Sequence, residues 1–381
     1  MMRILVISSS RADWGLLAPV VDELRRRPSI HVELALMGQH FMTGSDSLSQ
    51  LAAEGVCADY EIDMGLSDDD SPLALAEAMS VAIRGVAHAI ARGRPDLVLV
   101  LGDRYELLSA VSAALLARVP VAHLCGGDVT EGAIDDAVRH AITKLSALHF
   151  VTNAQSAARV AQLGEAEDRI HDVGSPGLDR MLQLLLMTRA ELLAEVGLAP
   201  DARYFLITCH PATLSEDPLR ECRAVLGALA RYPGHSLLFT GTNADPGARA
   251  IESEIRSFVS GTENAVFHET LGSRRYFSAL AYSDVVIGNS SSGLYEAPSF
   301  KVPTVNIGDR QKGRPRAASV IDCPPDPDAV ARAIADALRL DCADAVNPYG
   351  DGHAAARIAD VITGIADPAS LVRKPFVDRP A

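Results

Sequence analysis

Short apolar runs alternate with amphipathic helical patterns along most of the chain. Runs rich in branched side chains, such as Arg3–Ser8 and Leu97–Leu101, predict strands, and the second is apolar on both faces, as a central parallel strand should be. Segments with apolar side chains every three or four positions, such as Leu16–Arg26, predict the intervening helices. The alternation predicts an α/β fold with a doubly wound, Rossmann-like sheet.

The same rhythm restarts at Tyr204, with a strand over Tyr204–Cys209 and a helix over Leu219–Arg231, and it predicts a second parallel sheet. A length of 381 residues also exceeds what one hydrophobic core usually supports. We therefore expect an N-terminal domain over 1–180, a C-terminal domain over 181–366 and a Pro-rich tail over 367–381. Ligands of such folds bind at the carboxyl ends of the strands, so the interdomain cleft is the expected site.

Composition narrows the class of protein. The chain is 48% hydrophobic and 22% charged, which is ordinary for a soluble globular protein. Its net charge of −14 argues against a nucleic-acid partner. The start of the chain lacks a signal peptide's apolar stretch, and no uninterrupted apolar run suggests a membrane span, so we expect a cytoplasmic protein. Six cysteines without a C-x-x-C pair predict reduced core thiols and no structural metal.

An acidic loop follows the predicted strand near Val121. Its carboxylates are those of Asp128, Glu131, Asp135 and Asp136, and neighbouring glycines would let the backbone approach a ligand closely. Carboxylates so placed can move protons. Alternatively, Asp135 or Asp136 caps the helix that follows and complements its dipole.

Two further polar positions follow strands of the first half. Asp103 comes directly after Leu97–Leu101 and either caps a helix or transfers protons, for which partial burial beside another acid would suit it. Arg11 follows the first strand and either binds a phosphate through its forked guanidinium or is a surface arginine. No G-x-G-x-x-G motif occurs at that turn, which disfavours a dinucleotide site.

The second half has polar strand ends of its own. His210 either holds a phosphate oxygen, exchanges a proton or is structural. Small hydroxyls in Gly288–Gly293 precede a predicted helical segment and could cradle a diphosphate. Glu296 could accept hydrogen bonds from ribose hydroxyls or be a solvated acid, and Arg310 and Arg314 could supply cations or form a basic surface loop.

Taken in order, the motifs of the chain resemble a known family. They are SSSRADWGLL, LGDRYE, AHLCGGDVTEGAIDDAVRHAITKLS, DVGSPGLDR, CHPAT, TGTNADPG and GNSSSGLYEAPSFKVPTVNIGDRQKGR. The chain from about Met2 to Arg316 resembles the hydrolysing UDP-N-acetylglucosamine 2-epimerases of the sialic-acid type. The resemblance implies a GT-B-like fold with the sugar nucleotide in the cleft, no cofactor, and a homodimer or homotetramer.

The resemblance also implies a reaction. UDP is lost across C1 and C2 of the sugar to give a glycal intermediate, and water then adds with inversion at C2. A free N-acetylmannosamine-type sugar leaves, for nonulosonic (sialic or legionaminic) acid synthesis. Because the C2 proton is weakly acidic, a base, an acid and leaving-group stabilisation must act together, which would explain the acidic loop.

Residue roles follow from matching positions. The resemblance implies that Asp103, Asp135 and His210 are catalytic. The full set of expected substrate or UDP contacts is Arg11, Ser175, Asn243, Ser290, Ser291, Ser292, Glu296, Arg310 and Arg314.

One position departs from the family pattern. Many relatives have a glutamate two residues after the loop histidine, where this chain has Cys125. Asp128 or Glu131 could replace that glutamate, or the thiol could donate a proton. We favour Asp128.

Three rival functions stay open on the sequence. The same chemistry could act on UDP-diacetylbacillosamine or on a GDP-linked sugar. A GT-B glycosyltransferase would share the fold and nucleotide site but would need an acceptor. A sugar-nucleotide sensor without turnover is the third.

Overall fold

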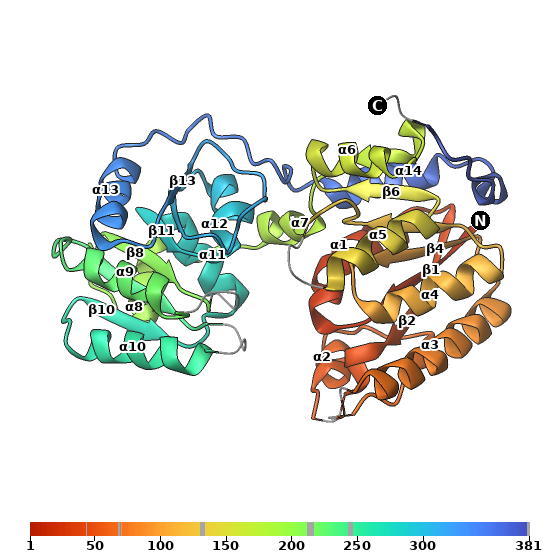
Figure 1. Ribbon diagram of the computed structural model, residues 1–381, viewed down its shortest axis with the longest axis horizontal. Coiled ribbons are helices and arrows are strands. Elements are labelled where there is room, and N and C mark those ends of the chain that lie inside the picture. The colour runs from red at the N-terminus through yellow and green to blue at the C-terminus, as the bar shows by residue number, and fades with distance from the viewer. Residues whose placement is uncertain are drawn as a thin grey trace. The chain divides into compact units, whose positions relative to one another are not determined.

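The chain folds into two compact units, each built on its own parallel sheet (Figure 1). The computed structural model describes residues 1–42, 44–67, 69, 71–129, 134–211, 217–242 and 247–378. Unit 1 consists of Met1–Arg180 and Tyr349–Ala381, and unit 2 of Met181–Pro348. The two parallel α/β sheets expected from the sequence are confirmed.

The sheet of unit 1 has seven parallel strands in the order β3-β2-β1-β4-β5-β6-β7. The central strands are apolar on both sides, and helices cover both faces. Their bounds are β1 Met2–Ser8, β2 Ile30–Met37, β3 Tyr60–Ile62, β4 Leu97–Leu101, β5 Val121–Leu124, β6 Leu148–Val151 and β7 Ile170–Asp172. The strand order reverses between β1 and β4, where Val6 is in register with Leu99.

Two sets of helices cover this sheet. Helices α1 (Arg11–Arg25) and α14 (Ala354–Thr363) pack on one face. Helices α3 (Pro72–Gly93), α4 (Tyr105–Leu116) and α5 (Ile134–Leu145) pack on the other. The remaining helical elements are η1 Gly38–Phe41, α2 Ser47–Ala53, α6 Ala154–Gln162, η2 Glu167–Arg169, α7 Pro176–Gln183 and η4 Pro368–Val372.

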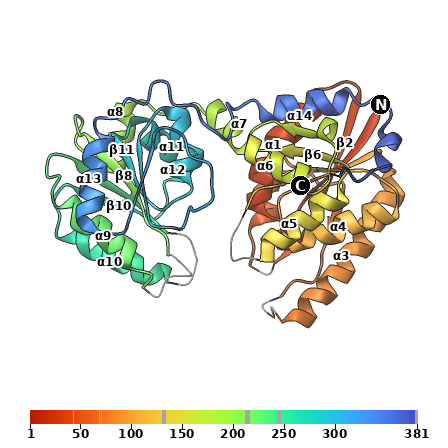
Figure 2. The same ribbon diagram turned by 45° about the horizontal axis from the view of Figure 1, so that its top comes forward.

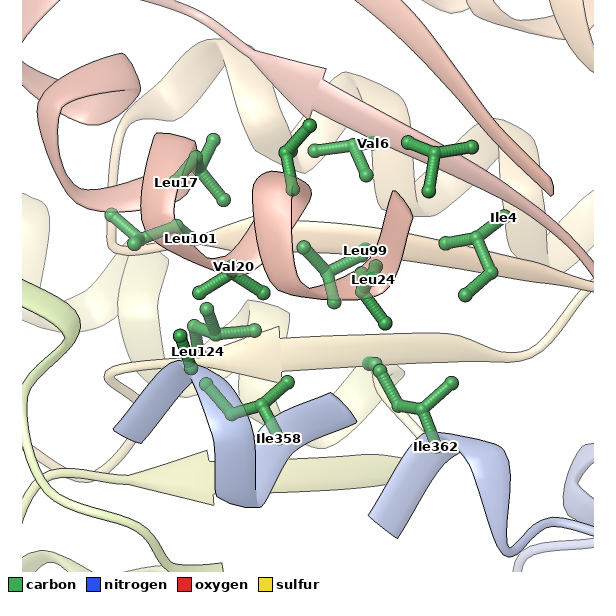
Figure 3. Close-up of a cluster of buried hydrophobic side chains, with 14 of the residues drawn as sticks. Ile4, Val6, Leu17, Val20, Leu24, Leu99, Leu101, Leu124, Ile358 and Ile362 are labelled. Carbon is green, nitrogen blue, oxygen red and sulfur yellow. The ribbon is translucent and has the colours of Figure 1, made fainter. Parts of the chain in front are cut away.

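Helix α14 lies in unit 1, whereas the boundaries expected from the sequence gave it to the second domain, 181–366. Figure 3 shows its Ile358 and Ile362 in the same buried cluster as Val20 and Leu24 of α1. Figures 1 and 2 both show the blue α14 within the unit that holds the red and orange elements. Periodicity predicts a helix here but not which sheet it covers, so the return of the chain to unit 1 could not be foreseen.

The chain leaves unit 1 after Arg180 and returns to it at Tyr349, and the residues near these two points contact each other within unit 1. Ser175 N–H donates to the Tyr349 carbonyl at 2.6 Å, and Asp179 accepts from the first backbone N–H groups of α14, at 3.0 Å from Ala354 and 2.6 Å from Ala355. A Cβ atom on Gly174 would lie 3.0 Å from the Cα of Gly350, so both points need glycine.

Unit 2 has six parallel strands in the order β10-β9-β8-β11-β12-β13. Their bounds are β8 Tyr204–Thr208, β9 Ser236–Thr240, β10 Ala265–His268, β11 Val285–Gly288, β12 Thr304–Ile307 and β13 Val320–Cys323. One face is covered by α9 (Arg220–Leu229), α10 (Ala248–Ser260) and α13 (Pro327–Ala337), and the other by α8 (Arg189–Val196) and α11 (Gly272–Tyr282). The short α12 (Ser292–Tyr295) and η3 (Ala297–Phe300) follow β11.

By length and composition alone, one helix in the described part of the chain, α3, could cross a membrane. The sequence had suggested no such segment. Its buried residues Ala78, Ala82, Val86 and Ala89 recur every three or four positions and pack in the core of unit 1. Only 28% of its apolar window is buried in the described structure, and a single helix of this kind is weak evidence for a span.

Candidate functional site

The strand order of each sheet reverses once, and polar residues gather at the carboxyl ends of the strands beside each reversal. In unit 1 these are the ends of β1 and β4, and in unit 2 those of β8 and β11. Such switch points are where open α/β sheets bind ligands. Apart from Ser175, which follows β7, every site residue expected from the sequence follows one of these strands or its next neighbour.

Arg139 is the centre of the polar group in unit 1. It forms an ion pair with Asp103, and its Nη1 donates to the backbone carbonyl of Asp128 at 2.7 Å. Its side chain is only 6% exposed. One buried cation therefore holds the two loops that carry the expected acid and base residues.

Arg139 was not predicted from the sequence as a residue of the site, although its position in the helical pattern indicated burial. It stands between Val138 and Ile142 on the buried face of α5, where an arginine must have a partner. Asp103 does not cap α4, since that helix has Arg104 at its N-cap and no side-chain cap.

Two hydroxyls orient the carboxylate of Asp128. Thr152 Oγ1 donates to its Oδ1 at 2.9 Å and Ser156 Oγ donates to the same atom at 2.6 Å. Both donors lie at the start of α6, whose N-cap is Asn153. The carboxylate is therefore fixed at a helix N-terminus, where negative charge is stabilised.

The other acidic residues of the loop lie in the first turn of α5. Asp135 is partly exposed there, and Asp136 pairs with Arg139 and His140 at 3.5 Å each. Glu131 lies outside the described residues. The structure thus brings Asp103, Asp128 and Asp136 to one arginine.

His123, near the end of β5, and Cys125, directly after it, precede the loop that carries Asp128. His123 is fully buried, and its Nε2 donates to the Gly102 carbonyl at 2.7 Å, so its Nδ1 accepts from Thr143 at 3.1 Å. Burial lowers the pKa of His123 to about 3, so the ring is neutral. Burial, with the charges of Asp128 and Asp13, raises the pKa of the Cys125 thiol. A higher pKa makes this thiol a weaker acid, which disfavours it as the proton donor.

Arg11 stands in the first turn of α1, directly after the buried serines that follow β1. It forms an ion pair with Glu54, and its Nη1 is buried without a hydrogen-bond partner in the described part of the chain. Nearby, His40 bridges Ser8 and Ser47 at 2.9 and 2.6 Å. Burial lowers the pKa of His40 to about 4, and the charges of Arg11 and Arg104 contribute to that shift. Arg11 keeps donor capacity for an anion.

A pocket of about 390 Å³ lies at the switch point of unit 2. Among its lining residues are five that the sequence had singled out: His210, Ser290, Ser291, Ser292 and Glu296. The sequence did not point to Thr208, Thr240 or Tyr276, which line it too. Its size suits part of a nucleotide, and its lining is rich in hydroxyl groups.

The turns after β8 and β11 are locked together. His210 N–H donates to Asn289 Oδ1 at 2.7 Å, and Asn289 Nδ2 donates back to the His210 carbonyl at 2.8 Å. Gly288 has φ +139°, and a Cβ atom there would lie 1.9 Å from the Thr208 carbonyl oxygen. Only glycine allows this approach, which explains the glycine that opens the GNSSSG motif.

Glu296 has an unused oxygen at this pocket. Its Oε2 is buried with no hydrogen-bond partner in the described part of unit 2. Burial raises the pKa of Glu296, and the hydrogen bond with Ser292 partly offsets that shift. Ser292 also accepts from the Tyr276 hydroxyl at 2.7 Å. A buried acceptor without a partner at a pocket marks a place for a ligand donor.

The other residues expected to contact the substrate include two arginines of unit 2. Arg310 Nη1 donates to the Asn289 carbonyl at 3.4 Å, and Arg314 lies over the Tyr295 ring at 5.6 Å. Ser175 is buried at the start of α7 in unit 1. Asn243 is outside the described ranges. Because α12 has only four residues, the expected helix-dipole contribution at Ser290–Ser292 is small.

Known proteins resemble this chain over most of its length. A family model described as UDP-N-acetylglucosamine 2-epimerase matches residues 22–363. The chain is 35% identical over 322 residues, 84% of each chain, to a GDP/UDP-N,N'-diacetylbacillosamine 2-epimerase (hydrolyzing) of Campylobacter jejuni. It is 31% identical, over 98% of each chain, to a UDP-N,N'-diacetylbacillosamine 2-epimerase (hydrolyzing) of Legionella pneumophila.

A solved structure shares the fold. The UDP-GlcNAc 2-epimerase of Neisseria meningitidis bound to UDP-GlcNAc superposes with a TM-score of 0.77 at 20% identity, covering 95% of this chain and all of that one. The expected GT-B-like fold is confirmed.

Proposed function

Because the chain belongs to the UDP-N-acetylglucosamine 2-epimerase family and is a UDP-sugar 2-epimerase, we propose that it is of the hydrolysing type. In this proposal it converts UDP-N-acetylglucosamine, or a close UDP-HexNAc, and water into UDP and the free 2-epimeric sugar. The product would serve nonulosonic acid synthesis. We also propose a soluble cytoplasmic homo-oligomer that needs no cofactor.

The hydrolysing type is supported by the relatives named hydrolyzing. The elimination step is supported by the Arg139 group, which consists of Arg139, Asp103, Asp128 and Asp136. A buried arginine holds Asp103 by its side chain and Asp128 by its backbone, while Thr152 and Ser156 orient the Asp128 carboxylate. Glycosyl transfer alone does not need such an array. Elimination does, because a C2–H bond must break together with the C1–O bond to UDP.

In the proposed reaction a carboxylate of this group takes the C2 proton, and the electron pair forms the C1–C2 double bond as UDP leaves. Arg11 and Arg310 would stabilise the departing diphosphate, and Glu296 would accept from the ribose. Water then adds its oxygen to C1, and a proton reaches C2 from the opposite face. The residues that we assign to proton movement are Asp103, Asp128, Asp135 and His210.

The names of two relatives favour a second substrate. Both hydrolysing relatives at 35% and 31% identity are named for N,N'-diacetylbacillosamine linked to UDP, and one also for GDP. The same acid-base group could act on that sugar, since the reacting C1 and C2 atoms are the same. We therefore test both sugars and both nucleotides.

The test is incubation with each nucleotide sugar in heavy water. We expect release of UDP and of a free sugar with deuterium at C2, and an Asp103→Asn variant should be slower by about 100-fold or more. A product that stays linked to UDP would contradict hydrolysis. UDP release only with an added acceptor would indicate a glycosyltransferase, and tight UDP binding without turnover of any sugar would indicate a sensor.

A further inference from the structure

The C-terminal segment of the chain is held in unit 1 by a charged cluster around the buried Glu165 carboxylate. Lys374 Nζ lies 2.8 Å from Glu165 Oε2, and the Lys374 side chain is only 16% exposed. Lys144 and His149 also contact the Glu165 carboxylate, at 2.8 and 2.9 Å. An ammonium that is largely removed from water needs charged and hydrogen-bonded partners, and these contacts fix the place of Lys374.

Lys374 also closes the C-terminal end of α5. Its Nζ donates to the backbone carbonyls of Lys144 at 2.6 Å and Ser146 at 2.5 Å, and more weakly to that of Thr143 at 3.4 Å. The last carbonyls of a helix have no partner within the helix and form the negative end of its dipole. A cation from a residue 230 positions later satisfies them.

Further contacts hold the segment in place. The Phe376 ring lies over Gly164 and 4.6 Å from Lys144 Nζ, and Val377 N–H donates to the Gly164 carbonyl at 2.9 Å. Arg169 donates to the carbonyls of Leu371 and Arg373. The Pro-rich stretch expected to be a tail is therefore packed along unit 1 from Leu371 to Val377.

Helix α5 connects the cluster around Glu165 to the Arg139 group. Arg139 and Thr143 are four residues apart on its buried face. Arg139 binds Asp103 and the Asp128 carbonyl, while Thr143 contacts His123, whose ring donates to the carbonyl of the residue before Asp103. Any shift of α5 along its axis therefore moves both contacts to the Asp103 loop.

We propose that Lys374 is a positioning residue for the reaction: it fixes the C-terminal end of α5 and thereby holds Arg139 and Thr143 against the loops of Asp103 and Asp128. The inference rests on the proposed function for its kinetic part only. Displacements of about 1 Å at reacting groups lower rates by as much as about 100-fold, so a small movement of α5 suffices.

The test compares Lys374→Met with Arg373→Met in the full-length chain. Both remove one charge from the same segment, but the Arg373 side chain is exposed and has no ion pair in the described part of the chain. Lys374→Met should lower kcat about tenfold with KM within about twofold at 25 °C. It should also speed hydrogen exchange several-fold over 139–146. Arg373→Met should change neither quantity, and Lys374→Arg should restore most of kcat.

Each outcome decides between this role and a merely structural one. A lower melting temperature with wild-type kcat in Lys374→Met would overturn the proposal, as would equal losses in Arg373→Met. If Lys374→Met does not fold, Phe376→Ala loosens the segment while keeping every charge, and it must reproduce the kcat loss. If the wild type turns over no nucleotide sugar, the proposed function fails, whereas unchanged exchange over 139–146 in Lys374→Met refutes the link to α5 independently.

Discussion

At the scale of single residues, Glu296 shows how a binding site departs from what stability alone would favour. Its carboxylate is held at the pocket of unit 2 with one buried oxygen that has no partner among the described residues, and burial raises its pKa. A raised pKa means that ionisation of Glu296 destabilises the folded state. This penalty is absent below the carboxyl's ordinary pKa of 4.5 and is complete above the raised one.

Glu296→Gln should therefore separate binding from stability. At pH 7.5 the variant should melt at the wild-type temperature or above it, and the difference should shrink as the pH falls toward 4.5. Its affinity for UDP should fall about 30-fold, because a hydrogen bond to a charged group contributes ~2 kcal/mol. Thermal unfolding and calorimetric titration with UDP measure both, with the exposed Glu263→Gln as the control. Unchanged UDP affinity would refute the ribose role.

The residues of the candidate site were predictable where a strand end is easy to locate. Asp103, His210 and Ser290 each follow an apolar run, and a parallel sheet brings such ends to one edge. The supporting residues were not predictable, because Arg139 contacts Asp103 across 36 positions and Tyr276 contacts Ser292 across 16. Such pairs depend on helix packing, which local patterns do not encode.

At the scale of elements, periodicity predicted most strands and helices, including several strands of three or four residues, and missed a few elements. β4 was found with its observed bounds, since its five residues are all buried. The edge strands β3 and β13 were not predicted, although the edge strands β7 and β10, which are as short and only partly buried, were. Helix α6, which orients Asp128, was also missed, because few of its residues are large and apolar.

The contact between β8 and β11 gives a prediction at this scale. Gly288→Ala would place a Cβ atom against the Thr208 carbonyl at a φ of +139°. We expect a loss of roughly 3 kcal/mol in the free energy of unfolding, from steric strain and backbone strain together. Denaturant unfolding measures it, and Gly234→Ala is the control because nothing lies within 4 Å of its added Cβ. Equal free energies of unfolding for the two variants would mean that β8 and β11 can move apart at Gly288 without loss of stability.

At the scale of the whole molecule, the chain leaves unit 1 after Arg180 and returns to it at Tyr349, so the two units differ in continuity. Unit 2 is one uninterrupted segment with its own sheet and core. Unit 1 depends on the last part of the chain, because Ile358 and Ile362 of α14 are fully buried against α1 and the sheet. The hydrophobic core of unit 1 therefore includes side chains from the segment that begins at Tyr349, whereas that of unit 2 does not.

This difference predicts how the chain tolerates division. Residues 181–348 produced alone should unfold cooperatively on heating, whereas residues 1–180 alone should not, since losing α14 exposes apolar side chains that contribute about 1.5–3 kcal/mol each. Two such isoleucines represent much of the ~5–15 kcal/mol that stabilises a typical domain. Joining 349–381 to residues 1–180 through a flexible linker should restore a cooperative transition, measured by circular dichroism. A sharp transition in residues 1–180 by themselves would show instead that the sheet and α1 suffice, and that α14 only covers a face already stable without it.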